Sequence, residues 1–258
     1  MRPQARPRWA VIWITGASSG IGRGLALALA REGSTVAASA RSKVDLARLS
    51  DEARVLPGKI VAFAVDVTDA NDVRRTVETI ETELGTIDLA VLNAGIYFRN
   101  EPTVASVDLF RMHLEVNVMG VVHGLEPLLE RFKSRRRGHV AVVASLAGYR
   151  GLPRASAYGA SKAALINLCE ALRVELRGSG VTISLVNPGF VKTPLTDKND
   201  FPMPFLMSLD DATNAILSGI EKNRFEIAFP KRLAFLMKVG RMLPYALYFW
   251  LTRRATGF

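Results

Sequence analysis

Residues 15–22 read Thr-Gly-Ala-Ser-Ser-Gly-Ile-Gly, and this stretch decides the fold. It follows an apolar run at residues 10–14 and leads directly into a helical pattern at residues 21–31. Glycines let a backbone approach a pyrophosphate without a Cβ in the way, and a helix N-terminus offers free N–H groups and a positive dipole end. Ser18 and Ser19 add hydroxyl donors. The stretch predicts a phosphate-binding turn between a strand and a helix, with a tight turn that holds no ligand as the alternative.

Outward from this turn, short apolar runs alternate with longer helical patterns. The expected strands are residues 10–14, 35–40, 60–65, 89–92, 140–144, 182–186 and 225–229. The expected helices are residues 21–31, 44–56, 70–84, 107–133, 157–177 and 210–223. This alternation is typical of βαβ units. It predicts an α/β fold in which residues 1–230 form a single domain, Rossmann-like, with a doubly wound parallel sheet of seven strands and helices on both faces.

The end of the second expected strand bears on the choice of dinucleotide. In such folds an acidic residue near this position binds the ribose 2′-hydroxyl, whereas an arginine can accommodate a 2′-phosphate. Here the strand runs into Ala40, Arg41 and Ser42, with no acid. Charge complementarity therefore favours NADP(H) over NAD(H). A solvated Arg41 with no ligand is the alternative.

Composition narrows the location and the kinds of partner. Cys169 is the only cysteine, which excludes an intrachain disulfide and fits a reducing compartment, so we expect a cytoplasmic protein. The net charge is +10, but the aromatic and basic motifs of nucleic-acid-binding folds are absent, and no nucleic-acid partner is expected. The histidines at 113, 123 and 139 lack metal-ligand spacing, so no metal site is expected. No apolar segment is long enough for a spanning helix, and the start lacks a signal-peptide pattern.

The chain resembles the classical short-chain dehydrogenase/reductase family from about residue 9 to residue 229, because several motifs occur in order. The motif residues that the resemblance assigns to cofactor binding are Gly16, Ser18, Ser19, Gly20, Ile21, Gly22, Asp66, Val67, Asn93, Ala94, Gly95, Pro188, Gly189, Val191 and Thr193, to which Arg41 is added. Two positions depart from the family pattern. Leu92 replaces the usual first asparagine before Asn93, and Ser19 stands where many NADP-dependent members carry a basic residue.

The resemblance also implies four catalytic residues, Asn117, Ser145, Tyr158 and Lys162. Tyr158 and Lys162 are four residues apart on an expected helix, so their side chains share one face. Tyr158 would exchange a proton with the substrate oxygen, and the Lys162 ammonium would lower the phenol pKa and also contact the cofactor. Ser145 would polarise the substrate oxygen. Asn117 would hold a water that relays protons from Lys162, with a buried, satisfied amide as the alternative.

These residues predict an enzyme that interconverts a carbonyl and an alcohol by hydride transfer. An NADPH-dependent reductase of an apolar ketone or aldehyde is the leading hypothesis, since Tyr149, Leu152, Phe190 and the apolar segment 201–207 would line or cover a pocket that also contains Ser145 and Tyr158. An NAD-dependent alcohol or steroid-type dehydrogenase is one alternative. A non-catalytic cofactor-binding interaction protein is another, although such proteins usually lose a catalytic residue. The resemblance further implies a homo-oligomer, a dimer or a tetramer.

Residues 231–258 are expected to form a basic, amphipathic C-terminal extension of the domain at residues 1–230. Six cations and no acid follow Glu226, and Pro244 should break or kink the helix. Flanking cations and aromatic side chains suit a peripheral helix in the plane of an anionic membrane. So apolar a segment equally suits packing on the core or on a neighbouring subunit. The sequence leaves both alternatives open.

Overall fold

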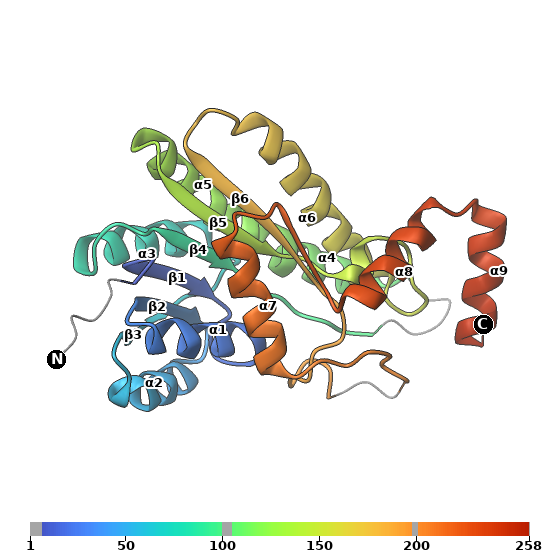
Figure 1. Cartoon of the computed structure of the whole chain (residues 1–258), viewed down its shortest axis with the longest axis horizontal. Coiled ribbons are helices and arrows are strands. Elements are labelled where there is room, and N and C mark those ends of the chain that lie inside the picture. Colours follow the sequence, from blue (N-terminus) through green and yellow to red (C-terminus); the bar gives the residue numbers. More distant parts are fainter. Residues whose placement is uncertain (1–6, 100–104, 198–200, 258) are drawn as a thin grey trace.

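A parallel sheet of seven strands forms the centre of the computed structural model, which describes residues 7–99, 105–197 and 201–257 (Figure 1). The strands are β1 (Val11–Thr15), β2 (Thr35–Ala40), β3 (Lys59–Ala64), β4 (Leu89–Leu92), β5 (Gly138–Val143), β6 (Val181–Pro188) and β7 (Glu226–Phe229). Their order across the sheet is β3-β2-β1-β4-β5-β6-β7. The expected strands and the doubly wound fold are confirmed, with small shifts at the strand ends.

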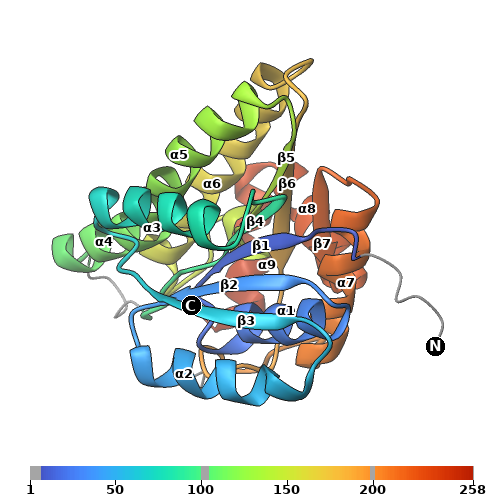
Figure 2. The same cartoon turned by 90° about the vertical axis from the view of Figure 1, so that its left-hand side faces the viewer.

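Helices cover both faces of this sheet, as Figure 2 shows. One face carries α1 (Gly20–Arg31), α2 (Lys43–Glu52) and α7 (Leu209–Glu221), and the other carries α3 (Ala70–Glu83), α5 (Gly120–Ser134) and α6 (Ser156–Glu175). Each set buries its own apolar cluster against the strands, with Leu25 and Ile216 in the first and Leu128 and Leu165 in the second. The inner strands β1, β4, β5 and β6 are buried on both faces, which is why they read as continuous apolar runs, whereas the edge strand β3 also carries exposed residues.

The sequence also encodes where several helices begin. The Asp69 carboxylate accepts hydrogen bonds from the N–H groups of Asn71 (2.9 Å) and Asp72 (3.0 Å) at the start of α3. The hydroxyls of Ser42 and Ser208 accept bonds of the same kind at the starts of α2 and α7. Such caps satisfy N–H groups that have no partner within the helix.

One expected helix differs from the structure. Residues 107–133 were expected to form one helix, but they divide into α4 (Val107–Leu114), a π-helical turn (Glu115–Met119) and α5. The wider turn contains Asn117, whose side chain is fully buried. Such turns are frequent at functional sites, because they re-aim one side chain without ending the helix. Periodicity could not predict it, since one extra residue in a turn leaves no compositional mark.

The last two helices, α8 (Lys231–Met242) and α9 (Tyr245–Thr256), follow β7. The break between them falls at Leu243 and Pro244, where the sequence predicts it. Within the described residues, no helix is both long enough and apolar enough to span a membrane.

Candidate active site

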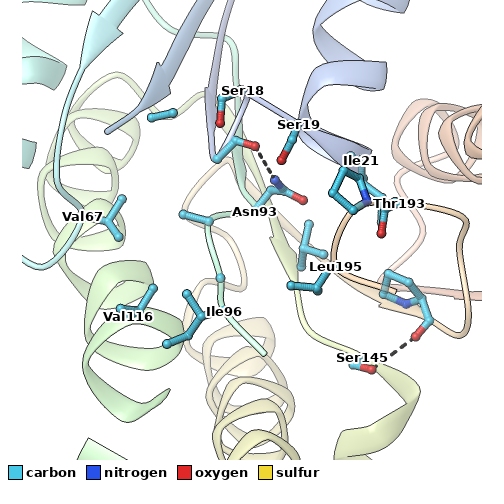
Figure 3. Close-up of a pocket in the computed structure, with 18 of the residues that line it drawn as sticks. Ser18, Ser19, Ile21, Val67, Asn93, Ile96, Val116, Ser145, Thr193 and Leu195 are labelled. Atoms are coloured by element: carbon cyan, nitrogen blue, oxygen red, sulfur yellow. Dashed lines mark hydrogen bonds between the residues drawn. The ribbon is translucent and has the colours of Figure 1, made fainter. Parts of the chain in front are cut away.

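A cavity of about 420 Å³ lies at the carboxyl ends of the central strands, where the strand order reverses between β1 and β4. In open α/β sheets this switch point is where ligands bind. Its walls combine the turn after β1, the ends of β4 and β5, the start of α6 and the segment after β6. Figure 3 shows Ser18, Ser19 and Ile21 toward one end of the cavity and Ser145 toward the other, with Asn93 between them.

Asn93 connects the two central turns through hydrogen bonds. Its side-chain Nδ2 donates to the carbonyl oxygens of Thr15 (3.1 Å) and Gly16 (3.2 Å). In return, the Thr15 hydroxyl accepts from the backbone N–H groups of Asn93 (3.0 Å) and Ala94 (3.1 Å). The glycine turn after β1 is therefore held rigidly against the turn after β4.

The glycine turn has the shape that a pyrophosphate requires. Gly16 has a φ of +66°, and a Cβ there would lie 2.8 Å from Ala94 Cα, so only glycine fits without strain. Ser19 caps α1, yet its side chain makes no capping hydrogen bond, which leaves the first N–H groups of the helix available to a ligand. Gly22 does not line the cavity; a Cβ there would lie 2.4 Å from the Gly16 carbonyl oxygen, so it allows close packing of the turn.

The side of the cavity that adjoins β2 and β3, opposite Ser145, is lined by Arg41, Ser42, Asp66 and Val67. A hydrogen bond from the Thr68 N–H (3.0 Å) to Asp66 Oδ1 holds the pKa of Asp66 below its usual range, and Arg41 adds a smaller electrostatic contribution. Arg41 and Asp66 thus line the same part of the cavity, and Arg41 favours the ionised form of Asp66. This end combines a fixed carboxylate and a cation, which suits the adenosine part of a dinucleotide.

Ser145, Tyr158 and Lys162 meet at the other end of the same cavity. Ser145 follows β5, and its hydroxyl accepts from the Ala147 N–H (3.1 Å) and donates to the Pro188 carbonyl (3.4 Å). Lys162 is buried, and its Nζ donates to the Val143 carbonyl (2.9 Å) and lies 5.7 Å from the centre of the Tyr158 ring. The fifth strand and α6 therefore bring together the three side chains that the sequence expects to act together.

Burial dominates the ionisation of this group. It raises the pKa of Tyr158 to about 12, a rise that the Ser145 hydroxyl opposes and that Tyr97 increases. It also lowers the pKa of Lys162 to about 8. The expected lowering of the Tyr158 pKa by Lys162 is thus not what this site shows, because removal of water from the phenolate outweighs the attraction of the ammonium. Tyr158 is a protonated phenol at neutral pH, a state suited to donating a proton.

Asn117 lies behind this group and does not line the cavity. Its Oδ1 accepts from the Ile96 N–H (2.8 Å), and its Nδ2 donates to the Ile96 carbonyl (3.1 Å) and to the Ser161 hydroxyl (2.9 Å). These bonds clamp the segment after β4 onto α6. Asn117 is therefore a buried amide with all its hydrogen bonds satisfied within the protein, which is one of the two alternatives that the sequence leaves open. That Asn117 holds a water for proton relay stays a prediction.

Of the residues expected to contact substrate, Ser145 and Tyr158 line the cavity, whereas Tyr149, Leu152 and Phe190 do not. Tyr149 is buried against β7, where its hydroxyl donates to Glu226 and borders a second cavity of about 250 Å³. This hydrogen bond holds the Tyr149 side chain at β7, outside the first cavity. Phe190 instead packs on Phe201, with ring centres 6.0 Å apart.

Sequence reasoning missed two aromatic residues beside Tyr158. The Tyr97 ring meets the Tyr158 ring edge-on at 5.0 Å, and the buried His113 ring lies 6.3 Å from it. His113 Nδ1 lies 2.8 Å from the Leu109 carbonyl, which requires a donor, and Nε2 accepts from the Phe98 N–H (3.2 Å). His113 is therefore a buried packing residue whose two ring nitrogens both have hydrogen-bond partners. Tyr97 could have been found from its place two residues after Gly95.

Apart from Gly22, every residue that the sequence assigns to cofactor binding lines the cavity. Further lining residues that the sequence did not indicate are Ala40, Ser42, Val65, Ile96, Val116, Val143, Ala144, Pro194, Leu195 and Thr196. Among the residues that the structure describes, no cluster of three or more potential metal ligands occurs. The arrangement can hold an elongated phosphate-containing ligand along the glycine turn and present its far end to Tyr158.

Comparison with known proteins agrees with this geometry. A family model described as short chain dehydrogenase matches residues 10–202. An uncharacterized oxidoreductase of Myxococcus xanthus is 41% identical over 241 residues, which cover 93% of this chain and 95% of the relative. The 3-oxoacyl-(acyl-carrier-protein) reductase FabG of Thermotoga maritima is 36% identical over 188 residues, which cover 73% of this chain and 76% of the relative.

Solved structures share the fold. A short-chain dehydrogenase/reductase from Burkholderia phymatum, in complex with NAD, matches with a TM-score of 0.82 and 25% identity over 88% of this chain and 91% of that one. An alcohol dehydrogenase from the archaeon Thermococcus sibiricus, complexed with 5-hydroxy-NADP, matches with a TM-score of 0.77 and 27% identity over 85% and 95% of the two chains. Both kinds of nicotinamide dinucleotide thus occur among the structural neighbours.

Proposed function

Because the chain belongs to the short-chain dehydrogenase family and is therefore a nicotinamide-dependent oxidoreductase, we propose that it reduces an apolar ketone or aldehyde with NADPH. The observation that carries the proposal is that Tyr158 shares one cavity with Ser145, Lys162 and the glycine turn. A phenol that keeps its proton at neutral pH is a donor, and carbonyl reduction consumes a proton. The Thermotoga relative is named a reductase, which supports the same direction.

In this proposal the bound cofactor supplies the hydride, and the side chains handle charge and protons. The Ser145 hydroxyl donates a hydrogen bond to the carbonyl oxygen as negative charge develops there. Tyr158 then transfers its proton to that oxygen. The ammonium of Lys162 stabilises the phenolate that remains, because the pair lies in a buried site where charges interact strongly.

Apolar side chains beside the reacting group support an apolar substrate. Tyr97 packs on Tyr158, and Leu195, which lines the cavity, is 41% exposed. Phe201 packs between Phe190 and the Arg99 guanidinium, which lies 5.1 Å from its ring centre. Of the side chains that line the cavity, those of Ile96, Val116 and Leu195 are apolar, and such walls reward apolar surface on a ligand. The proposal is tested by screening apolar ketones, aldehydes and lipid-like 3-keto compounds, with loss of NADPH or NADH absorbance as the readout; turnover that occurs only in the oxidative direction with NAD would contradict it.

Arg41 should set the preference for NADPH. Arg41→Asp replaces attraction to a 2′-phosphate with repulsion, so we expect the ratio of NADPH to NADH affinity to fall by about 100-fold, the worth of one or two charge-assisted hydrogen bonds. Titration of each dinucleotide against the purified protein measures the ratio. Arg48→Asp is the matched control, because Arg48 is exposed on α2 and does not line the cavity. An unchanged ratio in Arg41→Asp would remove Arg41 from the cofactor site.

A homo-oligomer also remains a proposal. Its support is a set of apolar side chains that α4 and the following π-helical turn leave exposed, namely Val107, Met112, Leu114 and Met119. Charges of both signs, such as Asp108 and Arg111, lie among them, so a second copy could pair with this surface. The solution mass of the protein decides this point.

A further inference from the structure

Helices α8 and α9 follow one another through the break at Leu243 and Pro244, and the segment of residues 231–257, called the α8–α9 hairpin, exposes many apolar side chains. Phe235 is 67% exposed, Met242 78%, Phe249 55% and Trp250 54%. Leu236, Tyr245, Leu247 and Leu251 are exposed as well. Within the described part of this hairpin, residues 231–257, only Ala234 and Tyr248 are buried. Packing on the core of the same chain, one of the alternatives that the sequence leaves open, therefore does not account for these side chains.

Cations stand at both outer ends of this apolar surface. Lys231 and Arg232 begin α8, and Arg253 and Arg254 lie in the last turn of α9. The apolar side chains fall between these ends, around the break at Pro244. Glu226 is the last acidic residue of the chain, and it pairs with Lys238. The exposed hairpin thus carries apolar side chains between two cationic ends, has Lys238 and Arg241 as further cations between those ends, and contains no acidic residue.

The hairpin is fixed to the body of the protein, so this surface has a definite direction. The Arg150 guanidinium donates to the carbonyls of Arg241 (2.8 Å) and Leu243 (3.3 Å) at the end of α8. It also lies over the rings of Tyr245 (4.7 Å) and Tyr248 (4.4 Å). The Tyr248 hydroxyl donates to the Gly151 carbonyl. Both contacts are on the loop that follows Ser145, and Figure 1 shows α9 at the extremity of the molecule toward which β1 points.

We propose that the α8–α9 hairpin binds the surface of an anionic lipid membrane, with its apolar side chains in the headgroup region and its cations on lipid phosphates. Apolar area and attraction to anionic lipids add in such an interface, and tyrosine and tryptophan suit its boundary. The contacts of Arg150 then hold the carboxyl end of the sheet, where the cavity opens, toward the bilayer. This inference does not depend on the proposed reaction.

Charge favours a membrane over a second copy of this chain. In a symmetric dimer the same patch meets itself, so two hairpins rich in cations and without acids would face each other. Like charges brought together in this way cost free energy, whereas an anionic lipid surface neutralises them. The α4 surface, with its mixed charges, is a better place for a second copy.

Sedimentation of the full chain with vesicles tests the proposal. We expect binding to vesicles of equal parts phosphatidylglycerol and phosphatidylcholine, weak binding to phosphatidylcholine alone, and release by salt. Arg232→Glu/Arg254→Glu should weaken binding by about 25-fold or more, because each cation near the surface is worth about 1 kcal/mol. Phe249→Ser/Trp250→Ser should weaken it by about tenfold or more through lost apolar area. All four side chains are exposed, so the fold should persist.

A matched control reverses the same number of positive charges at another place on the surface. Lys133→Glu/Arg177→Glu reverses two exposed cations near the ends of α5 and α6 and should leave vesicle binding within about twofold of wild type. Trp250 gives a second readout, since Trp9 and Trp13 are buried and a blue shift of tryptophan emission on vesicles must come largely from Trp250. Trp250→Phe should keep binding and lose the shift.

Three results would overturn the proposal. The first is no binding to anionic vesicles at low salt. The second is equal loss of binding in the control and the hairpin variants, which would indicate general electrostatic adsorption. The third is a fall in solution mass in the hairpin variants without vesicle binding by the wild type, which would assign the surface to a second copy. None of these measurements uses a substrate, so they stand apart from any test of the reaction.

Discussion

Tyr158→Phe should lower turnover by about 1,000-fold while it leaves the fold and cofactor binding intact. The phenylalanine ring preserves the edge-on contact with Tyr97, but the proton that reduction consumes has no donor. Because burial raises the pKa of Tyr158 to about 12, the wild-type phenol carries that proton at neutral pH. Single-turnover measurements with NADPH and a confirmed substrate separate the chemical step from binding.

Tyr245→Phe is the matched control for this experiment. It removes a hydroxyl of the same kind from a side chain that is 70% exposed on α9, and it should leave the reaction in solution unchanged. Dinucleotide affinity of Tyr158→Phe, measured by titration, should stay within a few-fold of wild type. A near wild-type rate in Tyr158→Phe would refute the assignment of the proton donor.

Lys162→Met should lower turnover by about 100-fold or more. Methionine fills a similar volume in the buried site, but the ammonium that stabilises the Tyr158 phenolate is gone, and the Val143 carbonyl loses its donor. The control Lys222→Met changes an exposed lysine on the opposite face, whose Nζ donates to Ser218, and should retain full activity. If Lys162→Met kept its rate, the phenolate would have to be stabilised by another group.

The pKa of Lys162 also predicts the pH dependence of the wild type. Burial lowers that pKa to about 8, so the ammonium is present below this pH and is lost as the pH rises through it. Reductive turnover should therefore be level below about pH 8 and fall above it, with NADPH and substrate held at saturation. A rate that rises between about pH 8 and pH 10 would show that the neutral amine is the active form.

The amino-acid sequence alone determined the fold and predicted most of the residues that line the cavity beside the glycine turn. Parallel strands buried on both faces need continuous apolar runs, and the turn at residues 15–22 needs glycine where a Cβ would collide with Ala94, so both leave local marks in the sequence. The resemblance to a known family predicted the group Ser145, Tyr158 and Lys162, and the four-residue spacing of Tyr158 and Lys162 on α6 predicted that these two side chains share one face.

Only the tertiary structure decided the features that depend on contacts between distant segments. Sequence spacing does not reveal the π-helical turn at Asn117 or the contact between Tyr97 and Tyr158. It also does not reveal that Tyr149 binds Glu226 instead of lining the cavity. The pKa of Tyr158 belongs to this group: four-residue spacing predicts the attraction of Lys162, but the loss of water that outweighs it arises only when the surrounding elements close. The same holds for the C-terminal hairpin, whose composition fits a core or a membrane equally, and whose exposed face appears only once Arg150 holds it in place.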